Sequence, residues 1–481
     1  MDFLQSANAT PCRYPFTQHN IDIRALLDKK TSLIFGTRGE SLKQMCVAIP
    51  RIYGQLKIHK ANHPIRPVIA YYTDPLYKLA KFLACWFKQA TNFAPAKATK
   101  NSIELAQDLK DRSFPPDSRL ISMDAVSMYT RIPVRYTIDC TLNHLRRVNI
   151  QQDIINEFEK LITICTKDNV CHFLGRTYRF PDGLPMGAPL SALMAEVFMD
   201  HLEDQILSSN DPSVQNILFY KRYVDDILCV WNGDDDQLWH ILDLFNDFHH
   251  SMEFTLEIGG TNINFLDLSL RLIPNGQHRQ ISFSVHRKDT YTGISIAHDS
   301  AHKMVTINHA IHRLIHLPLS AQAISEETQN IQLVANKNGL NLNIPLMIRK
   351  KRLRSLLSNI NPQPQTGNPD HSRTKWIRLP YLDSCSNKIS RELKRMDYKV
   401  GFYPLTTLNQ LVNLKDPIPK MKRPRIYRLE CGECSAQYIG QTGRPLSKRL
   451  GEHRSALPPR IQLWPNTAWS GITIFLKSIL L

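Results

Sequence analysis

Apolar and polar positions alternate along this chain with two different periods. Stretches with a period near 3.6 residues predict amphipathic helices, and short β-branched or aromatic runs predict strands. Helices are expected at 76–90, 134–147, 151–166 and 237–250, with a more apolar helix from Ala192 to Leu207. Hairpins are expected at 171–180 and 217–232. Helical and strand patterns thus mix over residues 1 to about 335, which indicates an α+β fold.

Two adjacent carboxylates, Asp225 and Asp226, lie at the tip of the hairpin expected at 217–232. Apolar strands on both sides deprive them of hydration while they repel each other, a cost that a hard cation such as Mg²⁺ offsets. Taken alone, an Asp-Asp turn is more often an ordinary exposed hairpin loop. The rest of the chain favours the metal-binding interpretation.

A third carboxylate, Asp124, ends another apolar run, upstream at 119–125. Two metal ions about 3.5–4 Å apart can activate a 3′-hydroxyl and stabilise a leaving pyrophosphate when carboxylates from separate strands converge on them. Between the two acidic strand ends lies a Gly- and Pro-rich loop that contains Gly183, Met186 and Gly187. Glycines let a backbone approach a base or a template closely, so this loop is a candidate nucleotide or template contact.

These three blocks, in this order and spacing, resemble the palm of a reverse transcriptase, and the residues around them are similar to those of Penelope-like retroelements. The resemblance implies a right-hand polymerase with fingers, palm and thumb. It implies two Mg²⁺ ions held by Asp124, Asp225 and Asp226, and an RNA template, a DNA primer and dNTPs as partners. Nothing in the sequence indicates an oligomeric state.

The same resemblance assigns roles to residues around the centre. Tyr129 falls where such polymerases keep an aromatic that collides with a ribose 2′-OH, although a core tyrosine is the alternative. Arg66 is the candidate triphosphate clamp, because a guanidinium suits phosphate oxygens. Lys57 and Lys60 could add charge nearby or be ordinary surface lysines. The later blocks at 254–257 and 264–270 fit plain hairpin packing as well as the family's palm.

Composition favours a polyanionic partner. The 481 residues include 60 Lys and Arg against 43 Asp and Glu, a net charge of +17, which also fits ribosomal or membrane-surface proteins. No run is apolar enough to span a bilayer and no signal peptide is visible, so we expect a soluble, intracellular chain. Scattered cysteines indicate reduced thiols. The basic run at 349–354 is a candidate nuclear import signal, a phosphate-binding face or a solvated helix face.

Near the C-terminus the chain resembles the front half of a GIY-YIG endonuclease, the nicking module of Penelope-like elements. The matching residues are Tyr427, Tyr438, Gly440, Arg449 and His453. No glutamate follows at the family's metal-binding position, so we expect a weak or inactive nuclease. A possible zinc site at Cys431 and Cys434, with His453 as a third ligand, falls short of the four ligands that structural zinc prefers. The abrupt tail and the short N-terminal side suggest a truncated copy.

Resemblance and composition together predict the domains. They are an N-terminal segment and fingers at 1–118, the palm with the active site at 119–290, a thumb-like helical region at 291–358, a Pro- and Gly-rich linker and connector at 359–424, a partial GIY-YIG-like domain at 425–457 and a divergent tail at 458–481.

The predicted function is that of an RNA-directed DNA polymerase, a nucleotidyltransferase, with a weak or inactive nuclease remnant. The alternative is a catalytically inactive, basic nucleic-acid-binding relic of such an element, which the truncated ends favour. The intact carboxylates favour the polymerase. A domesticated terminal transferase or telomere-maintenance polymerase would share the same active site.

Overall fold

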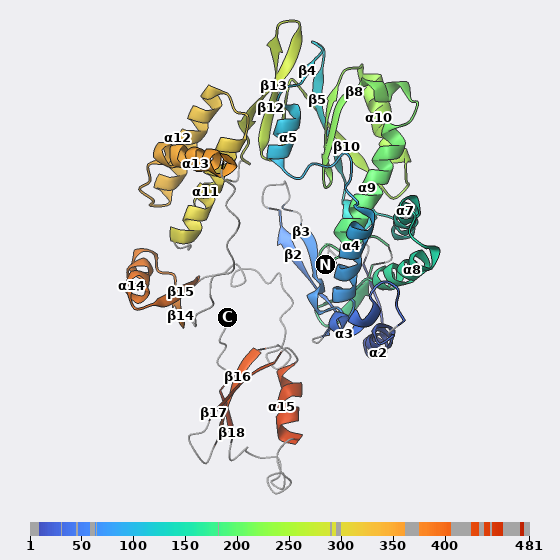
Figure 1. The fold of residues 1–481 in the computed structure, drawn as a ribbon, viewed down its shortest axis with the longest axis vertical. Helices are drawn as coiled ribbons and strands as arrows, with labels where there is room; N and C mark the ends of the chain where they lie inside the picture. Colours follow the sequence, from blue (N-terminus) through green and yellow to red (C-terminus); the bar gives the residue numbers. More distant parts are fainter. Residues whose placement is uncertain are drawn as a thin grey trace.

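The fold is described by a computed structural model (Figure 1). It describes residues 9–29, 31–44, 47–57, 63, 65–180, 182–288, 291–294, 300–360, 375–405, 425–431, 437–442, 445–455 and 472–475. Within these ranges no helix has both the length and the apolar character needed to cross a membrane. Lys60 and Cys434, both named as candidates above, lie outside the described residues.

An antiparallel sheet, here called the central sheet, carries the acidic strand ends. Its strands are, in order, β10 (Phe254–Gly260), β5 (Arg119–Ala125), β9 (Asp226–Trp231) and β8 (Ile217–Tyr223). Strand β9 is buried on both of its faces. On β9, Ile227, Cys229 and Trp231 belong to the main core, whereas the alternate residues Leu228 and Val230 belong to a second core. This two-sided burial explains why β9 is apolar throughout instead of alternating.

Helices cover the first face and another sheet covers the second (Figure 1). The main core is built largely from α4 (Tyr77–Thr91), α7 (Val134–Arg147), α8 (Gln152–Lys167), α9 (Ser191–Leu207) and α10 (Asp235–Asp247). The second core lies between the central sheet, α5 (Ser102–Leu109) and an outer sheet of β11 (Asn262–Phe265), β12 (Leu268–Asn275), β13 (His278–Val285) and β4 (Ser113–Phe114). The strand ends of the central sheet are therefore supported from both sides.

The predicted helices and hairpins are confirmed. The expected helices correspond to α4, α7, α8, α9 and α10. The expected hairpins correspond to β6 (Val170–Phe173) with β7 (Arg176–Arg179) and to β8 with β9. Helix α10 begins slightly earlier than expected because the Asp234 side chain caps it by accepting a hydrogen bond from the Gln237 backbone N–H.

A further sheet, here called the N-terminal sheet, includes a hairpin from the range assigned to the palm. Its strands are, in order, β1 (Thr10–Pro11), β7 (Arg176–Arg179), β6 (Val170–Phe173), β2 (Arg51–Leu56) and β3 (Ile65–Ala70). The β6–β7 hairpin lies within the range assigned to the palm, yet it pairs with β2 in parallel at Arg51 and His172. The order of elements along the chain does not predict this strand pairing, because Arg51 and His172 are far apart in the sequence.

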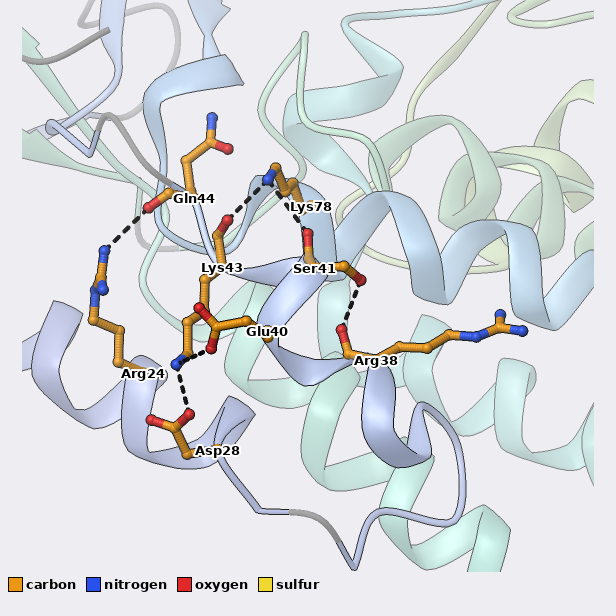
Figure 2. A network of polar contacts seen from close by, with 8 residues as sticks. All are labelled: Arg24, Asp28, Arg38, Glu40, Ser41, Lys43, Gln44 and Lys78. Carbon is orange, nitrogen blue, oxygen red and sulfur yellow. Dashed lines mark hydrogen bonds and ion pairs between the residues drawn. The ribbon is translucent and has the colours of Figure 1, made fainter.

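Short helices on the N-terminal side are fastened to α4 by polar contacts (Figure 2). Lys43 forms ion pairs with Asp28, which directly follows α2 (Phe16–Leu27), at 2.5 Å and with Glu40 of α3 (Gly39–Leu42) at 2.6 Å. Lys78 of α4 donates to the backbone oxygen of Lys43 at 2.9 Å. The remaining short elements are η1 (Gly36–Arg38), η2 (Tyr71–Thr73), α6 (Met128–Arg131) and η3 (Pro212–Asn216).

The range assigned to a thumb holds α11 (Ser300–His316), α12 (Ala321–Lys337) and α13 (Ile344–Ile360), which share a core of their own. Two ion pairs join this region to the outer sheet. Arg313 of α11 lies 2.8 Å from Asp267, and Arg287, beyond β13, makes a two-pronged pair with the buried Glu327 of α12. Asp267, in the last of the family-like blocks, therefore binds a neighbouring helix.

Two ranges in the C-terminal part contain helices and strands that were not predicted from the sequence. The range 359–424, expected to be a linker and connector, contains a folded unit of β14 (Lys375–Pro380), α14 (Asp383–Arg395) and β15 (Tyr398–Tyr403), with parallel strands. The tail expected at 458–481 supplies β18 (Ile472–Phe475), which pairs with β16 (Arg425–Cys431) beside β17 (Gln437–Thr442) and α15 (Leu446–Ser455). The last sheet therefore extends past residue 457.

A buried carboxyl at the start of α4 makes the stability of the fold depend on pH. Asp74 is 5% exposed, accepts a hydrogen bond from the Leu76 N–H at 2.8 Å, and has its pKa raised to about 7 by burial. In the unfolded chain the pKa of Asp is about 3.9. Between these values the folded state binds a proton that the unfolded state has lost, so the free energy of unfolding falls as pH rises through this window.

We therefore predict that Asp74→Asn flattens the pH dependence of thermal unfolding between pH 4 and 8 and raises the melting temperature at pH 8. Asparagine keeps an acceptor for the Leu76 N–H but has no charge to bury. Melting curves of both proteins across this range test the prediction. Parallel curves for the two proteins would show that Asp74 is not the group responsible.

Candidate active site

The central sheet brings two of the candidate carboxylates face to face. Asp124, next to the end of β5, is paired in register with Asp226, the first residue of β9. On the other side of β5, Thr255 of β10 is paired with Asp124, and its hydroxyl donates to the Asp124 backbone oxygen at 3.4 Å. Directly opposed residues on antiparallel strands have Cβ atoms about 4.5–5.5 Å apart. The two carboxylates are thus neighbours at the same edge of the sheet.

Asp225 lies in the tight turn between β8 and β9. Tyr223 pairs with Asp226, so Val224 and Asp225 alone form the turn. The Ala125 N–H donates to the Asp225 backbone oxygen at 3.2 Å, which ties the turn to the end of β5. Val224 has φ +57°, a left-handed conformation in which a β-branched residue is strained by roughly 1–3 kcal/mol. Surrounding contacts must hold this turn in place.

A buried arginine supplies that support. Arg222 is 1% exposed, and its Nη1 donates to the Val224 backbone oxygen at 3.0 Å. Its Nε donates to Glu203 of α9 at 2.6 Å, and Nη2 lies 3.4 Å from Glu196 on the same helix face. Burial alone would lower the pKa of Arg222, but the two carboxylates raise it, so the guanidinium stays charged.

The buried ion pair between Arg222 and Glu203 adds little to the free energy of unfolding. Glu203 also accepts a hydrogen bond from the Tyr220 hydroxyl at 2.9 Å, yet its Oε2 atom is buried without a hydrogen-bond partner. Buried ion pairs with unsatisfied atoms contribute little net stability. What the pair does provide is position: it fixes the carbonyl that precedes Asp225. This ion pair was not predicted from the sequence. The signal for it is that Arg222, Glu196 and Glu203 are charged residues inside apolar runs.

The Gly- and Pro-rich loop is clamped between two parts of the protein. Gly183 has φ +84°, and a Cβ there would lie 2.4 Å from the Thr130 backbone oxygen. Gly187 has φ +112°, and a Cβ there would lie 2.3 Å from the Ile69 backbone oxygen of β3. The Ile69 N–H donates to the Met186 oxygen at 2.9 Å. The close approach that these glycines permit is to the protein's own backbone, and a template contact stays a prediction.

Tyr129 lies on α6, beside the turn. Its ring is half-buried against the main core, and its backbone oxygen accepts a hydrogen bond from the Leu184 N–H. Burial, followed by the charge of Asp225, raises the pKa of its hydroxyl. Both interpretations of Tyr129 thus keep some support: the residue packs on the core and also lies near a candidate catalytic carboxylate.

The candidate phosphate-binding residues lie on the β2–β3 hairpin of the N-terminal sheet. Arg66 is exposed on β3, the strand that is bonded to the loop at Met186, and it is paired with Gln55. Lys57 directly follows β2 and is partly exposed. The loop therefore connects this hairpin to the acidic edge of the central sheet.

The three carboxylates are candidate ligands for a metal ion. Among the described residues, no group of three or more His, Cys, Asp or Glu side chains lies close enough together to hold a metal ion unaided. The backbone register nevertheless makes Asp124, Asp225 and Asp226 neighbours. Mg²⁺ commonly takes one or two carboxylates and completes its shell with substrate phosphates and water. The donor set fits Mg²⁺ if bound nucleotide contributes ligands.

The C-terminal sheet brings together part of the nuclease-like set. Arg449 of α15 donates from Nε to the hydroxyl of the buried Tyr427 at 3.2 Å, and from Nη1 to Glu452 at 2.8 Å. Gly440 of β17 is paired with Tyr427 of β16. Tyr438, Cys431 and His453 lie on β17, β16 and α15, respectively. Arg449 thus has both a tyrosine hydroxyl and a carboxylate of this chain as partners.

An acidic turn thus lies beside a second acidic strand end, on an antiparallel sheet backed by helices. Residues 58–262 match the family described as reverse transcriptase (RNA-dependent DNA polymerase). They form a reverse transcriptase domain, the polymerising domain of RNA-directed DNA polymerases. All three carboxylates, Arg66, Tyr129 and the loop fall inside the match, and the region from 263 onward falls outside it.

Several telomerase structures resemble the chain. Telomerase from Candida albicans, in complex with a TWJ fragment of telomeric RNA, is 9% identical, with a TM-score of 0.45 over 66% of this chain and 61% of that one. The corresponding complex from Candida tropicalis is 10% identical, with a TM-score of 0.40 over 67% and 56%. Apo telomerase from Candida tropicalis is 9% identical, with a TM-score of 0.37 over 71% and 64%.

The chain thus spans less than two thirds of the length of these telomerase chains. TM-scores below 0.5 assign neither a function nor a partner to it. Among curated proteins, none matches the chain.

We predict that Arg222→Lys lowers kcat for primer extension by about ten- to a hundredfold, the scale expected when reacting groups are displaced by about 1 Å. Lysine keeps the charge beside Glu203 but lacks the fork that also reaches the Val224 oxygen. KM for dNTP should change little, because the variant alters the turn and leaves the nucleotide contacts in place. Steady-state kinetics and a melting curve check both points.

Tyr220→Phe is the matched control, since it removes another hydrogen bond to Glu203 at 2.9 Å without touching the turn. It should lose about 1 kcal/mol of stability and keep its kcat. Equal losses of kcat in the two variants would mean that Arg222 acts through general stability and not through the turn.

Proposed function

We propose that this protein is an RNA-directed DNA polymerase of a Penelope-like retroelement, with Asp124, Asp225 and Asp226 as its catalytic carboxylates. One observation carries the proposal: Asp124 is paired with Asp226 across β5 and β9, and Asp225 lies in the turn beside them. The reverse transcriptase domain at 58–262 supports the reaction class. The subtype rests on resemblance of sequence alone.

The three carboxylates would hold two Mg²⁺ ions together with the triphosphate of the incoming dNTP. Such ions activate the primer 3′-hydroxyl and stabilise the charge of the leaving pyrophosphate. The chain's own part is positional. Arg222 fixes the turn that carries Asp225, and the clamped loop fixes β3 relative to the central sheet. Arg66 on β3 is the proposed clamp for the triphosphate, and Lys57 adds positive charge nearby.

The proposed partners are an RNA template, a DNA primer and dNTPs. A net charge of +17 suits all three, because each is an anion. The basic run on α13 is a proposed nuclear import signal, although Lys351 within it donates to the Asn308 backbone oxygen of α11 at 2.8 Å. Its neighbours Lys350 and Arg352 are exposed.

For the C-terminal region we propose a GIY-YIG remnant that binds DNA without cutting it. The Tyr427–Arg449 contact is compatible with such a fold. Cys431 and Cys434 stay a possible zinc site with too few assigned ligands. A second candidate for the whole chain is an inactive nucleic-acid-binding protein. The net charge of +17 suits this candidate as well, and primer extension separates the two.

We predict that the protein extends oligo(dT) on poly(rA) with Mg²⁺ and that Asp225→Asn lowers kcat by about 10²–10³-fold or more, as expected when a group that stabilises transition-state charge is lost. Binding to primer–template should keep its affinity and its salt dependence, because Asp225 contacts no phosphate directly. Extension kinetics and fluorescence anisotropy measure the two quantities.

Asp236→Asn is the control: it removes the same charge from an exposed position on α10 and should leave extension unchanged. An Asp225→Asn protein that extends primers at the native rate would refute the assigned centre. A native protein that binds primer–template and never extends it would favour the inactive binding protein.

Tyr129 offers a test of sugar selection. Tyr129→Ala should raise the ratio of kcat/KM for ribonucleotides to that for deoxyribonucleotides by about tenfold or more, mainly through a lower ribonucleotide KM, because a clash at binding is relieved. Tyr129→Phe keeps the ring and should keep the native ratio. An unchanged ratio in the alanine variant, with a lowered melting temperature, would leave Tyr129 as a core residue only.

A further inference from the structure

The unit of β14, α14 and β15, here called the connector unit, has two different faces. Residues alternate between the faces of a strand, and the parallel register pairs Trp376 with Lys399, Arg378 with Gly401 and Pro380 with Tyr403. These residues share one face of the two strands. The alternate residues, Ile377, Leu379, Val400 and Phe402, share the other face.

Helix α14 lies against the two strands (Figure 1), and side-chain contacts place it over the face that carries Phe402. The ring of Phe402 packs against the buried Tyr381 at 5.5 Å, and the Tyr381 hydroxyl accepts a hydrogen bond from Asn387 of α14 at 3.4 Å. Ser386 of α14 donates to the Pro380 backbone oxygen at 2.7 Å, which fastens the helix to the end of β14. The unit is therefore a small folded layer with its other face turned outward.

Aromatic rings and cations alternate on the outward face. Trp376 is 65% exposed, and the Lys399 Nζ lies 5.8 Å from its ring centroid. The Arg378 guanidinium lies 4.8 Å from the ring centroid of Tyr403. Between these pairs, Gly401 leaves space: a Cβ there would meet nothing within 4 Å. The face thus presents two ring–cation pairs on either side of an open centre.

This combination suits one class of ligand. Proteins bind single-stranded nucleic acid by stacking bases on aromatic rings and pairing phosphates with nearby cations, at about 1–3 kcal/mol per stacked base. Lys and Arg outnumber Asp and Glu over residues 375–405, so the surroundings favour a polyanion. A duplex keeps its bases stacked on each other and so offers no free base faces to Trp376.

We propose that the outward face of the connector unit binds single-stranded RNA, with bases stacked on Trp376 and Tyr403 and phosphates paired with Arg378 and Lys399. This site lies outside the reverse transcriptase domain at 58–262. The choice of RNA rests on the proposed function, because the strand to be copied is the single strand that such a polymerase handles. The site itself rests on the connector unit alone.

The test is photo-crosslinking of the full chain to a short single-stranded RNA that carries 4-thiouridine, without dNTPs, followed by peptide mapping. Crosslinks should fall on Trp376 or Tyr403. Trp376→Ala should lower the crosslink yield in residues 375–405 by about tenfold, in line with the loss of one stacked base. Trp376→Phe should keep most of the yield, because a ring remains.

Trp239→Ala is the matched control. Trp239 is 51% exposed on α10, where Asp235, Asp236 and Asp243 lie one turn away along the helix, so this exposed tryptophan in acidic surroundings should contribute nothing. The Asp225→Asn protein should crosslink like the native chain. A failed polymerase assay with intact crosslinking would therefore overturn the proposed function and leave this site standing.

Three results would overturn the proposal. The first is the absence of any crosslink within residues 375–405, and the second is an unchanged crosslink yield in Trp376→Ala. The third is competition by poly-L-glutamate that is as effective as competition by unlabelled RNA, because it would show that the site selects charge alone. Equal crosslinking of a matched single-stranded DNA with 4-thiothymidine would overturn the assignment to RNA.

Discussion

The ion pair between Arg222 and Glu203 is the interaction on which the acidic centre depends. A valine at φ +57° and two adjacent carboxylates are unfavourable together, and neither the strand nor the turn alone would keep them in place. Arg222 donates from Nη1 to the Val224 backbone oxygen, and it donates from Nε to Glu203 of α9. Glu203 is left with an unsatisfied buried oxygen, so the pair is better explained by the geometry that it imposes than by the stability that it adds.

The same centre is fixed from two further directions. Strand β9 is buried on both faces, and alternate residues of β5 and β9 contribute to two different cores. The loop at 183–187 closes against Thr130 and against Ile69 of β3 with no room for a Cβ at either glycine. Through this loop the hairpin that carries Arg66 keeps its position relative to Asp225. Arg66 and the carboxylates thus lie on separate parts of the chain that this loop joins.

The sequence predicted the elements with long, regular periodicity. Helices α4, α7, α8, α9 and α10 and the acidic hairpin follow from local pattern. Convergence of Asp124 on Asp225 and Asp226 was predicted, whereas the register that pairs Asp124 with Asp226 was not. Long-range pairings were missed, because no local signal predicts that β6–β7 joins β2, that β18 joins β16 or that Arg222 meets Glu203. The connector unit was missed because its short strands follow a Pro- and Gly-rich stretch that is typical of a linker.

The central claim is that Asp124, Asp225 and Asp226 form one metal-binding centre once a nucleotide is bound. Replacing Mg²⁺ by Fe²⁺ in the complex with primer–template and dNTP, and then generating hydroxyl radicals, tests this directly, because the backbone is cut where the ion sits. The account predicts cuts near Asp124 and near Asp225–Asp226, suppressed by excess Mg²⁺ and lost in Asp225→Asn. Cuts elsewhere, or cuts at these strand ends that persist in Asp225→Asn, would contradict it.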